Sequence, residues 1–329
     1  MNEIQQGTIA LYYLILGAFG YNFKDLIKWA SGTFNPVYFD NRILLSDRTS
    51  RRTVKKYLAF LVKNGQAFDY IYGIPKAGIG PATLLAMELK KPLLIKHGGK
   101  YYAIDVQNIE RVIRVNGGEK WGSLGDVIAA TIPFGIVFGI IGAEIANLPF
   151  LFVREKEKDH GKKKQIEGIV ISRQQALLID PFVPNVMRYT EDATDALMAS
   201  GITVREVIDI DISQHITFME SLSGKRIAAV EDLISTGESS LKEVLTLREA
   251  GAIVPKIYSI FNYALPAATE NFKKNDCESA SILSFPQFLV TYKQTGQLPE
   301  EDAIELLNWY DNQPTWAIEK GLAVVKDFC

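Results

Sequence analysis

Residues 226–251, RIAAVEDLISTGESSLKEVLTLREAG, contain the pattern that decides the fold. Four apolar residues, Ile227 to Val230, predict a buried strand, and a short polar loop follows them. A helix is then expected from about Ser240 to a stop near Gly251. A strand, loop and helix of this kind is the repeating unit of an α/β fold, in which helices flank a parallel sheet.

The loop after this strand has the composition of a phosphate site. Amides at a helix N-terminus point at an anion, and the serine and threonine hydroxyls here add donors. Two adjacent acids at the end of a buried strand are costly unless a ligand compensates them. An ordinary strand-to-helix connection with capping hydroxyls is the alternative. The candidate residues are Glu231, Asp232, Leu233, Ile234, Ser235, Thr236, Gly237, Glu238 and Ser239.

A second informative segment is residues 69–95, DYIYGIPKAGIGPATLLAMELKKPLLI. It predicts a strand, a glycine-rich loop, a helix and another strand. Backbone amides together with one lysine suit a pyrophosphate, so we take Lys76, Ala77 and Gly78 as candidate ligands of such a group.

An internal repeat involves this second segment. Asp69 aligns with Asp126 at an offset of 57 residues, and the register continues without a gap to Pro92 and Pro149. The second copy keeps the apolar core but replaces Lys76 with Pro133. The first motif has a similar counterpart in residues 176–212, where DPFVP replaces the acid pair and the phosphate loop, and its two prolines remove amide donors.

We therefore expect two related α/β units, the second nested in the first. The outer unit, residues 1–97 and 225–329, keeps both loops, and the inner unit, residues 98–224, has lost them. A coincidence of the strand–helix rhythm is the alternative.

Other segments give simpler expectations. Apolar spacing predicts a helix over residues 2–30 with a break at Gly20, and another over Thr49–Asn64. Residues 33–42 predict a strand-like segment. Residues 127–143 carry no charge over 17 residues and predict a buried strand and helix, a membrane span being the alternative.

Composition limits the possible functions. The 329 residues are 47% hydrophobic and 22% charged, which is typical of a globular protein with a large core. A net charge of −2 gives no nucleic-acid footprint. Two distant cysteines suggest neither a disulfide framework nor a zinc site. The first twenty residues lack a basic segment and a cleavage motif, so we expect a cytoplasmic protein without a membrane partner.

The VEDLISTGES motif resembles the PRPP (phosphoribosyl pyrophosphate) loop of type I phosphoribosyltransferases, and in particular that of orotate phosphoribosyltransferases. The resemblance extends to WASGTFNPVYFDNR, where it implies a pyrimidine pocket containing Phe39, and to the C-terminal region. Ala30 and the pair Asn262-Tyr263 depart from the family pattern near the base. A phosphoribosyltransferase for another base therefore stays open, as does a non-catalytic PRPP-sensing regulator.

Residues 153–168, VREKEKDHGKKKQIEG, resemble the hood loop of the same family, which crosses a dimer interface and covers the partner's site. Arg154, Lys158 and His160 match the residues that act on the neighbouring subunit, whereas Glu155 replaces the lysine that serves its own. A solvated hairpin tip is the alternative. The resemblance implies an internal pseudo-dimer in which the inner unit supplies the hood to the outer site. A further homodimer stays open.

The family reaction implies the remaining roles. Orotate N1 replaces pyrophosphate on the ribose of PRPP, with Mg²⁺ held mainly through PRPP and water rather than by direct protein ligands. Arg154, Lys158, His160 and Asp232 are the implied catalytic residues.

Overall fold

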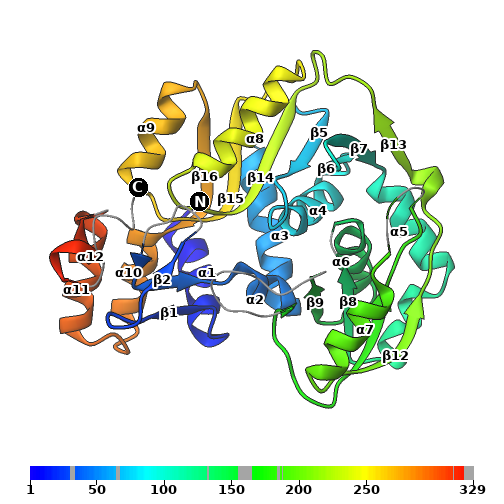
Figure 1. Cartoon of the computed structure of the whole chain (residues 1–329), viewed down its shortest axis with the longest axis horizontal. Coiled ribbons are helices and arrows are strands. Elements are labelled where there is room, and N and C mark those ends of the chain that lie inside the picture. The colour runs from blue at the N-terminus through cyan, green and yellow to red at the C-terminus, as the bar shows by residue number, and fades with distance from the viewer. Residues whose placement is uncertain are drawn as a thin grey trace.

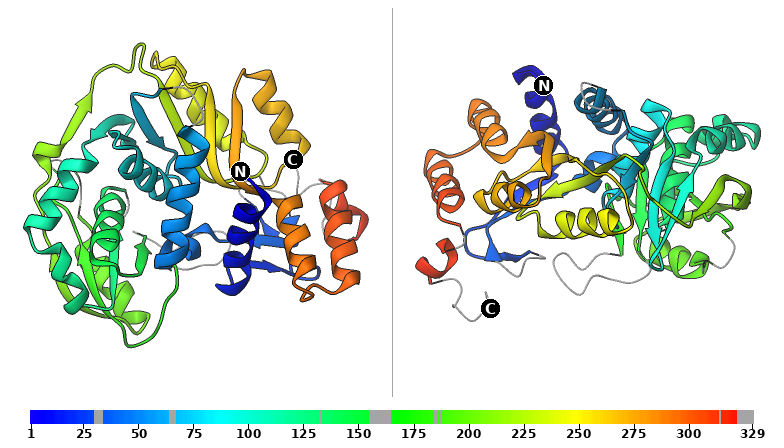
Figure 2. Two further views of the ribbon diagram at one scale, coloured as in Figure 1. Left: turned by 180° about the vertical axis from the view of Figure 1, so that it is seen from behind. Right: turned by 90° about the horizontal axis from the view of Figure 1, so that it is seen from above.

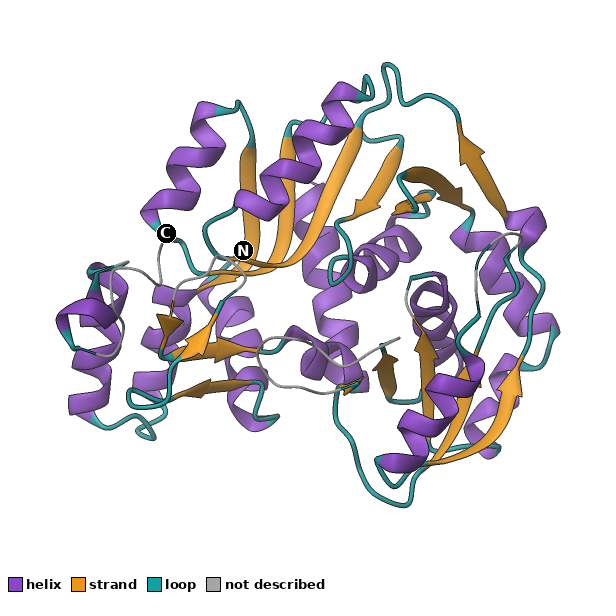
Figure 3. Ribbon diagram, in the orientation of Figure 1, coloured by secondary structure: helices purple, strands orange, loops and turns teal. Residues whose placement is uncertain are grey.

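The computed structural model describes residues 1–29, 34–63, 67–131, 133–154, 165–183, 186, 188–313 and 315–321. These residues form an α/β molecule with two main sheets, and helices cover the faces of both (Figures 1 and 3). The predicted fold class is confirmed.

The larger sheet has seven strands. In spatial order they are β13 (Ile216–Met219), β7 (Lys100–Ile104), β6 (Leu93–His97), β5 (Tyr70–Gly73), β14 (Ile227–Ile234), β15 (Lys256–Asn262) and β16 (Glu278–Ser284). The five strands from β6 to β16 are parallel, whereas β7 and β13 pair antiparallel at one edge. β7 and β13 lie within the range 98–224, so this part of the chain also contributes to the larger sheet.

Both faces of the larger sheet are buried, which explains its continuous apolar strands. Ala228 and Val230 pack in the same core as α3 (Arg48–Lys63) and α4 (Ile79–Leu89). Ile227 and Ala229 point to the other face, in the core with α8 (Glu238–Glu249) and α9 (Pro266–Lys274).

The smaller sheet has five strands. In spatial order they are β10 (Ile166–Glu167), β9 (Phe150–Val153), β8 (Val127–Thr131), β11 (Gln175–Ile179) and β12 (Thr203–Ile208). α6 (Phe134–Ala146) covers one face and α7 (Thr190–Ala199) the other, while α5 (Val106–Val115) packs beside α6. The predicted buried strand and helix in residues 127–143 are confirmed. No helix of the described ranges is long and apolar enough to span a bilayer.

The two sheets meet through α4 and α6, which lie between them in Figure 1. A Cβ atom on Gly80 of α4 would be 3.2 Å from Ile140 Cδ1 of α6, so these helices approach closely. One hydrophobic cluster therefore runs from the larger sheet to the smaller.

The N- and C-terminal segments pack together at one end of the molecule, where α1 lies against α10 (Figure 2). The elements there are α1 (Glu3–Ile15), β1 (Phe19–Tyr21), β2 (Ile27–Lys28), β3 (Phe34–Asn35), β4 (Val37–Phe39), α10 (Phe285–Gln294), α11 (Glu300–Asp311) and α12 (Trp316–Glu319). α2 (Asn41–Ser46) follows β4 and packs on α3 and on β9 of the smaller sheet.

Several boundaries differ from the prediction. The helix expected over residues 2–30 is wrong beyond Ile15, because residues 19–21 pair with 37–39 in an antiparallel ladder. The strand-like segment ends at Phe39, and Asp40 accepts a hydrogen bond from the Arg42 amide to begin α2. The helix at Arg48–Lys63 is confirmed over the described residues.

The central strand and helix also differ slightly from the expected bounds. β14 continues through the acid pair to Ile234, since Glu231 and Leu233 still pair with β15 after β5 has ended. α8 begins at Glu238, two residues before the expected start.

Candidate active site

The two loops expected to bind phosphates lie at one edge of the larger sheet. β5 and β14 are parallel neighbours with Gly73 opposite Val230, so both loops leave the same carboxyl edge. The Ile74 amide donates to the Val230 carbonyl at 2.9 Å. Ligands of open α/β sheets bind at such an edge.

Gly78 shows how tightly the first loop sits on the acid pair. A Cβ atom at this position would overlap the Val230 carbonyl oxygen and lie 2.9 Å from Glu231 Oε2. Lys76 is exposed in the same loop, after a cis peptide bond from Pro75. The structure thus places Gly78 against the acid pair, and Lys76 and Ala77 precede it in the same loop.

Glu231 is the acid of the site whose negative charge is least compensated. Its Oε2 atom is buried and has no hydrogen-bond partner among the described residues. Burial, and then the charge of Asp232, raise the pKa of Glu231 well above its ordinary value. A buried carboxylate oxygen without a hydrogen-bond partner among the described residues is suited to a ligand hydroxyl or cation.

Asp232 has two stabilising neighbours, Arg42 and Asn41. Burial raises its pKa, and the nearby charge of Arg42 opposes that rise. The Asn41 side-chain amide donates to the Asp232 main-chain carbonyl at 2.9 Å, which fixes the backbone of the pair.

The second loop turns sharply into α8. Gly237 has φ = 77° and precedes the first helical residue, and the Phe272 ring leaves no room for a Cβ atom there. Asn271 Nδ2 donates to the Thr236 carbonyl at 3.2 Å. Ser235 and Thr236 are half-buried, and Glu238 and Ser239 are exposed. The amides at the N-terminus of this 12-residue helix are positioned for an anion.

Two residues of this segment serve the core instead. The Ile234 side chain is buried against α8 and α9, and Leu233 packs in part against the other core. A ligand would meet these two residues through their backbone.

The root of the predicted hood loop reaches the outer unit. Arg154 Nε lies 3.0 Å from Glu167 Oε2, and Arg42 Nε lies 2.9 Å from the same oxygen. Arg154 is therefore linked through Glu167 to a residue that interacts with Asp232. Lys158 and His160 lie outside the described residues.

The sequence prediction missed Arg42, Asn41 and Glu167. Their partners are distant in the chain: Arg42 and Glu167 are 125 residues apart, and Asn41 and Asp232 are 191 apart. The polar run Asp40-Asn41-Arg42 after an apolar strand is the signal that could have indicated the first two.

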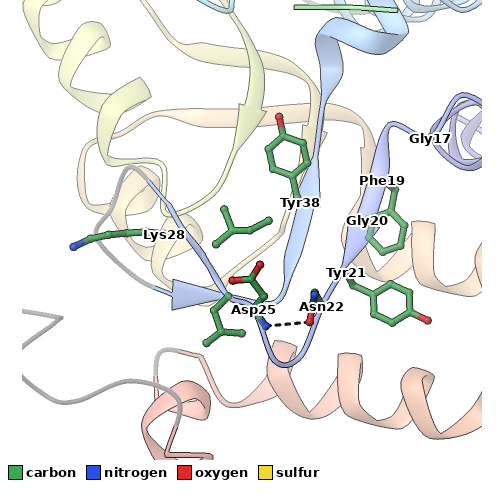
Figure 4. A pocket seen from close by; sticks show the side chains of 10 residues that line it. Gly17, Phe19, Gly20, Tyr21, Asn22, Asp25, Lys28 and Tyr38 are labelled. Atoms are coloured by element: carbon green, nitrogen blue, oxygen red, sulfur yellow. Dashed lines mark hydrogen bonds between the residues drawn. The ribbon is translucent and has the colours of Figure 1, made fainter. Parts of the chain in front are cut away.

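Phe39 does not face a cavity. Its ring is buried and stacks on Phe261 with 4.0 Å between centroids, so a contact with a base would use its backbone. Tyr38, on the opposite face of β4, and Lys28 line a pocket of about 510 Å³ between β1 and the β2 segment (Figure 4). Tyr263, at a departure from the family pattern, is buried and packs on Trp29 with 4.4 Å between centroids.

The corresponding edge of the smaller sheet is occupied by the chain itself. Asp180 follows Ile179, which pairs with Ala130, as Glu231 follows Val230, which pairs with Gly73. Asp180 forms an ion pair with Arg188 at 3.0 Å. Phe134, the first residue of α6, is buried and packs on His97 with 5.6 Å between ring centroids.

Comparisons with known proteins agree with this geometry. No family model matches the chain. It is 14% identical to a Leishmania donovani UMP synthase structure, with a TM-score of 0.50, covering 93% of this chain and 42% of that one. The fold is that of the type I phosphoribosyltransferases.

The sequence relatives are more specific. The chain is 24% identical to an orotate phosphoribosyltransferase of Lactiplantibacillus plantarum over 97% of its own length and 99% of the relative's. It is 25% identical to one from Streptococcus mutans over 89% of both chains. The chain is a homologue of the orotate phosphoribosyltransferases, as the PRPP-loop motif indicated.

Proposed function

We propose that this protein is an orotate phosphoribosyltransferase, which converts orotate and PRPP to orotidine 5′-monophosphate and pyrophosphate in pyrimidine biosynthesis. The observation that carries the proposal is the contact between the Lys76–Gly78 loop and the acid pair at one sheet edge. Full-length similarity to proteins of that name supports the choice of base.

The reaction breaks the bond between ribose C1′ and the pyrophosphate oxygen and forms one between C1′ and orotate N1. The amides and hydroxyls of Ser235–Ser239 hold the 5′-phosphate at the start of α8. The carboxylates of Glu231 and Asp232 accept hydrogen bonds from the ribose hydroxyls. As positive charge develops on the sugar, these acids stabilise it without having to reorganise.

The leaving pyrophosphate needs cations. Lys76 supplies one from the outer unit, and Arg154, Lys158 and His160 supply others from the inner unit. Mg²⁺ would neutralise the same oxygens when bound. Among the described residues no cluster of three metal-ligating side chains exists, which fits an ion held mainly through PRPP and water. The Glu231 oxygen without a partner is the protein atom of the acid pair that such an ion or its water would meet.

The inner unit acts in this proposal as an internal partner. Strands β6-β5-β14-β15 of the larger sheet and β9-β8-β11-β12 of the smaller share one order, and an antiparallel strand follows β6 and β9 alike. This correspondence supports a duplication with the second copy inserted between β7 and β14. Because β7 and β13 pair in the larger sheet, we place the inserted unit from α5 through β12.

A site completed within one chain requires no second copy, although further dimerisation remains compatible with it. We also propose a cytoplasmic location, because both substrates are highly charged and charged groups do not enter a hydrocarbon layer unaided.

The test is steady-state turnover with PRPP and Mg²⁺, followed by the loss of orotate absorbance. Turnover with another base but none with orotate would show that the assignment of orotate as the base is wrong. Adenine and uracil are useful comparisons, because the buried Tyr263 departs from the family pattern near the base. K76A and K158A should each reduce kcat about 10²- to 10³-fold, as expected for loss of one charge-stabilising group. Full activity of the monomeric K158A variant would refute the contribution of the inner unit.

A further inference from the structure

Glu167 holds two arginines from different parts of the chain. It is 7% exposed and belongs to β10 of the smaller sheet. Arg154, directly after β9, and Arg42, in α2, both place Nε within about 3 Å of its Oε2 atom, and Arg42 Nη1 donates to Oε1 at 3.0 Å. One carboxylate therefore joins the root of the hood loop to the outer unit.

This cluster continues to the acid pair. Asn41, the neighbour of Arg42 in α2, donates to the Asp232 carbonyl at 2.9 Å. The Arg42 guanidinium also acts on the Asp232 carboxyl electrostatically. The path from Asp232 to Arg154 thus passes through one helix and one buried carboxylate.

We propose that Glu167 is a positioning residue, which fixes Arg154 relative to the acid pair and so aims it at the pyrophosphate of PRPP. The inference rests on the proposed function. Glu167 itself touches neither substrate; it acts through Arg154.

The negative charge of Glu167 is essential to this role. Two guanidinium groups lie on one carboxylate, and a neutral side chain would leave like charges adjacent in a buried place. Repulsion between the two guanidinium groups would then move the Arg154 side chain away from α2. A displacement of about 1 Å from the reacting geometry can cost on the order of 10²-fold in rate.

The chain contains a matched control. Glu144 of α6 is 5% exposed and also joins two cations of the outer unit, with Arg51 Nε at 2.9 Å and Lys55 Nζ at 2.7 Å. Arg51 bonds further to main-chain carbonyls of residues 45, 46 and 148, away from the acid pair. Loss of the Glu144 carboxylate should weaken the contact between α3 and α6 without moving Arg154.

The experiment compares E167Q, E167D and E144Q with the unmodified protein. We expect E167Q to lower kcat with orotate about 10- to 100-fold, and to weaken pyrophosphate binding in calorimetry while ribose 5-phosphate binding stays unchanged. E144Q should lower the melting temperature as much as E167Q but keep both affinities and kcat. E167D, which restores the charge, should recover part of the loss.

Each outcome decides between the claims. If E167Q and E144Q have the same kcat and pyrophosphate affinity, Glu167 has only a structural role and the inference is wrong. If the unmodified protein binds pyrophosphate but does not use orotate, the base assignment fails, and the calorimetric comparison still tests Glu167. If it binds neither pyrophosphate nor ribose 5-phosphate, both proposals fall.

Discussion

Neutralising Glu231 should make the free protein more stable and destroy its activity. Its Oε2 atom is buried without a partner among the described residues, and burial raises its pKa well above the ordinary value. A buried polar atom left without a partner costs about 1–3 kcal/mol, so E231Q, which removes the charge from this atom, should recover about that amount at pH 8. For 329 residues, 1 kcal/mol corresponds to about 1.4 °C, which gives a rise in Tm of about 1.5–4 °C.

The pH dependence provides a second check of the same effect. A folded-state pKa above the unfolded value means that the folded protein binds the proton more tightly, so stability falls as pH rises through the folded pKa. The advantage of E231Q should therefore be largest at alkaline pH and shrink toward acid. Thermal denaturation without ligands, at pH 8 and pH 6, measures it.

Asp180 is the control, because it occupies the corresponding place in the smaller sheet with the opposite environment. Arg188 and Thr190 both bond to its carboxyl group. D180N should lower stability by about 1–3 kcal/mol, the cost of leaving a charged partner unsatisfied. A lower Tm for E231Q than for the unmodified protein at pH 8 would contradict the whole argument.

Two further predictions concern the same edge. G78A should reduce kcat about 10²-fold, because its Cβ atom would displace the loop from Val230 and Glu231; G7A, where nothing lies within 4 Å, is the control, and normal turnover of G78A would show that the loop does not position pyrophosphate. Calorimetry with PRPP should give one site per chain, and two sites would show that the smaller sheet also binds.

The sequence predicted the parts of the site that are continuous in the chain. Glu231, Asp232 and the following loop are read from one motif, because a buried strand, a turn and a helix depend on local pattern. The segments whose structure was predicted wrongly are formed by contacts with residues distant in the chain. Residues 19–21 form a strand only because residues 37–39 lie beside them, and no local spacing reveals that pairing.

Side-chain direction was equally hard to predict. Tyr38 and Phe39 are neighbours in β4, and strand alternation sends one toward the pocket and the other into the core. Which of the two faces the core depends on Phe261 and on the helices behind it. The Arg42–Glu167 ion pair joins α2 to β10 of the smaller sheet, so it could not be found from either segment alone.

The two sheets place an acid at corresponding positions in opposite surroundings. In the smaller sheet Arg188 forms an ion pair with Asp180, and Phe134 at the start of α6 contacts His97. In the larger sheet the Glu231 Oε2 atom has no hydrogen-bond partner in the part of the chain that the structure describes. An acid that stays unpaired at an energetic cost is expected where a ligand completes it. An acid with only a structural role would make the protein more stable if it had a partner. The contrast between Asp180 and Glu231 therefore supports binding at the larger sheet alone.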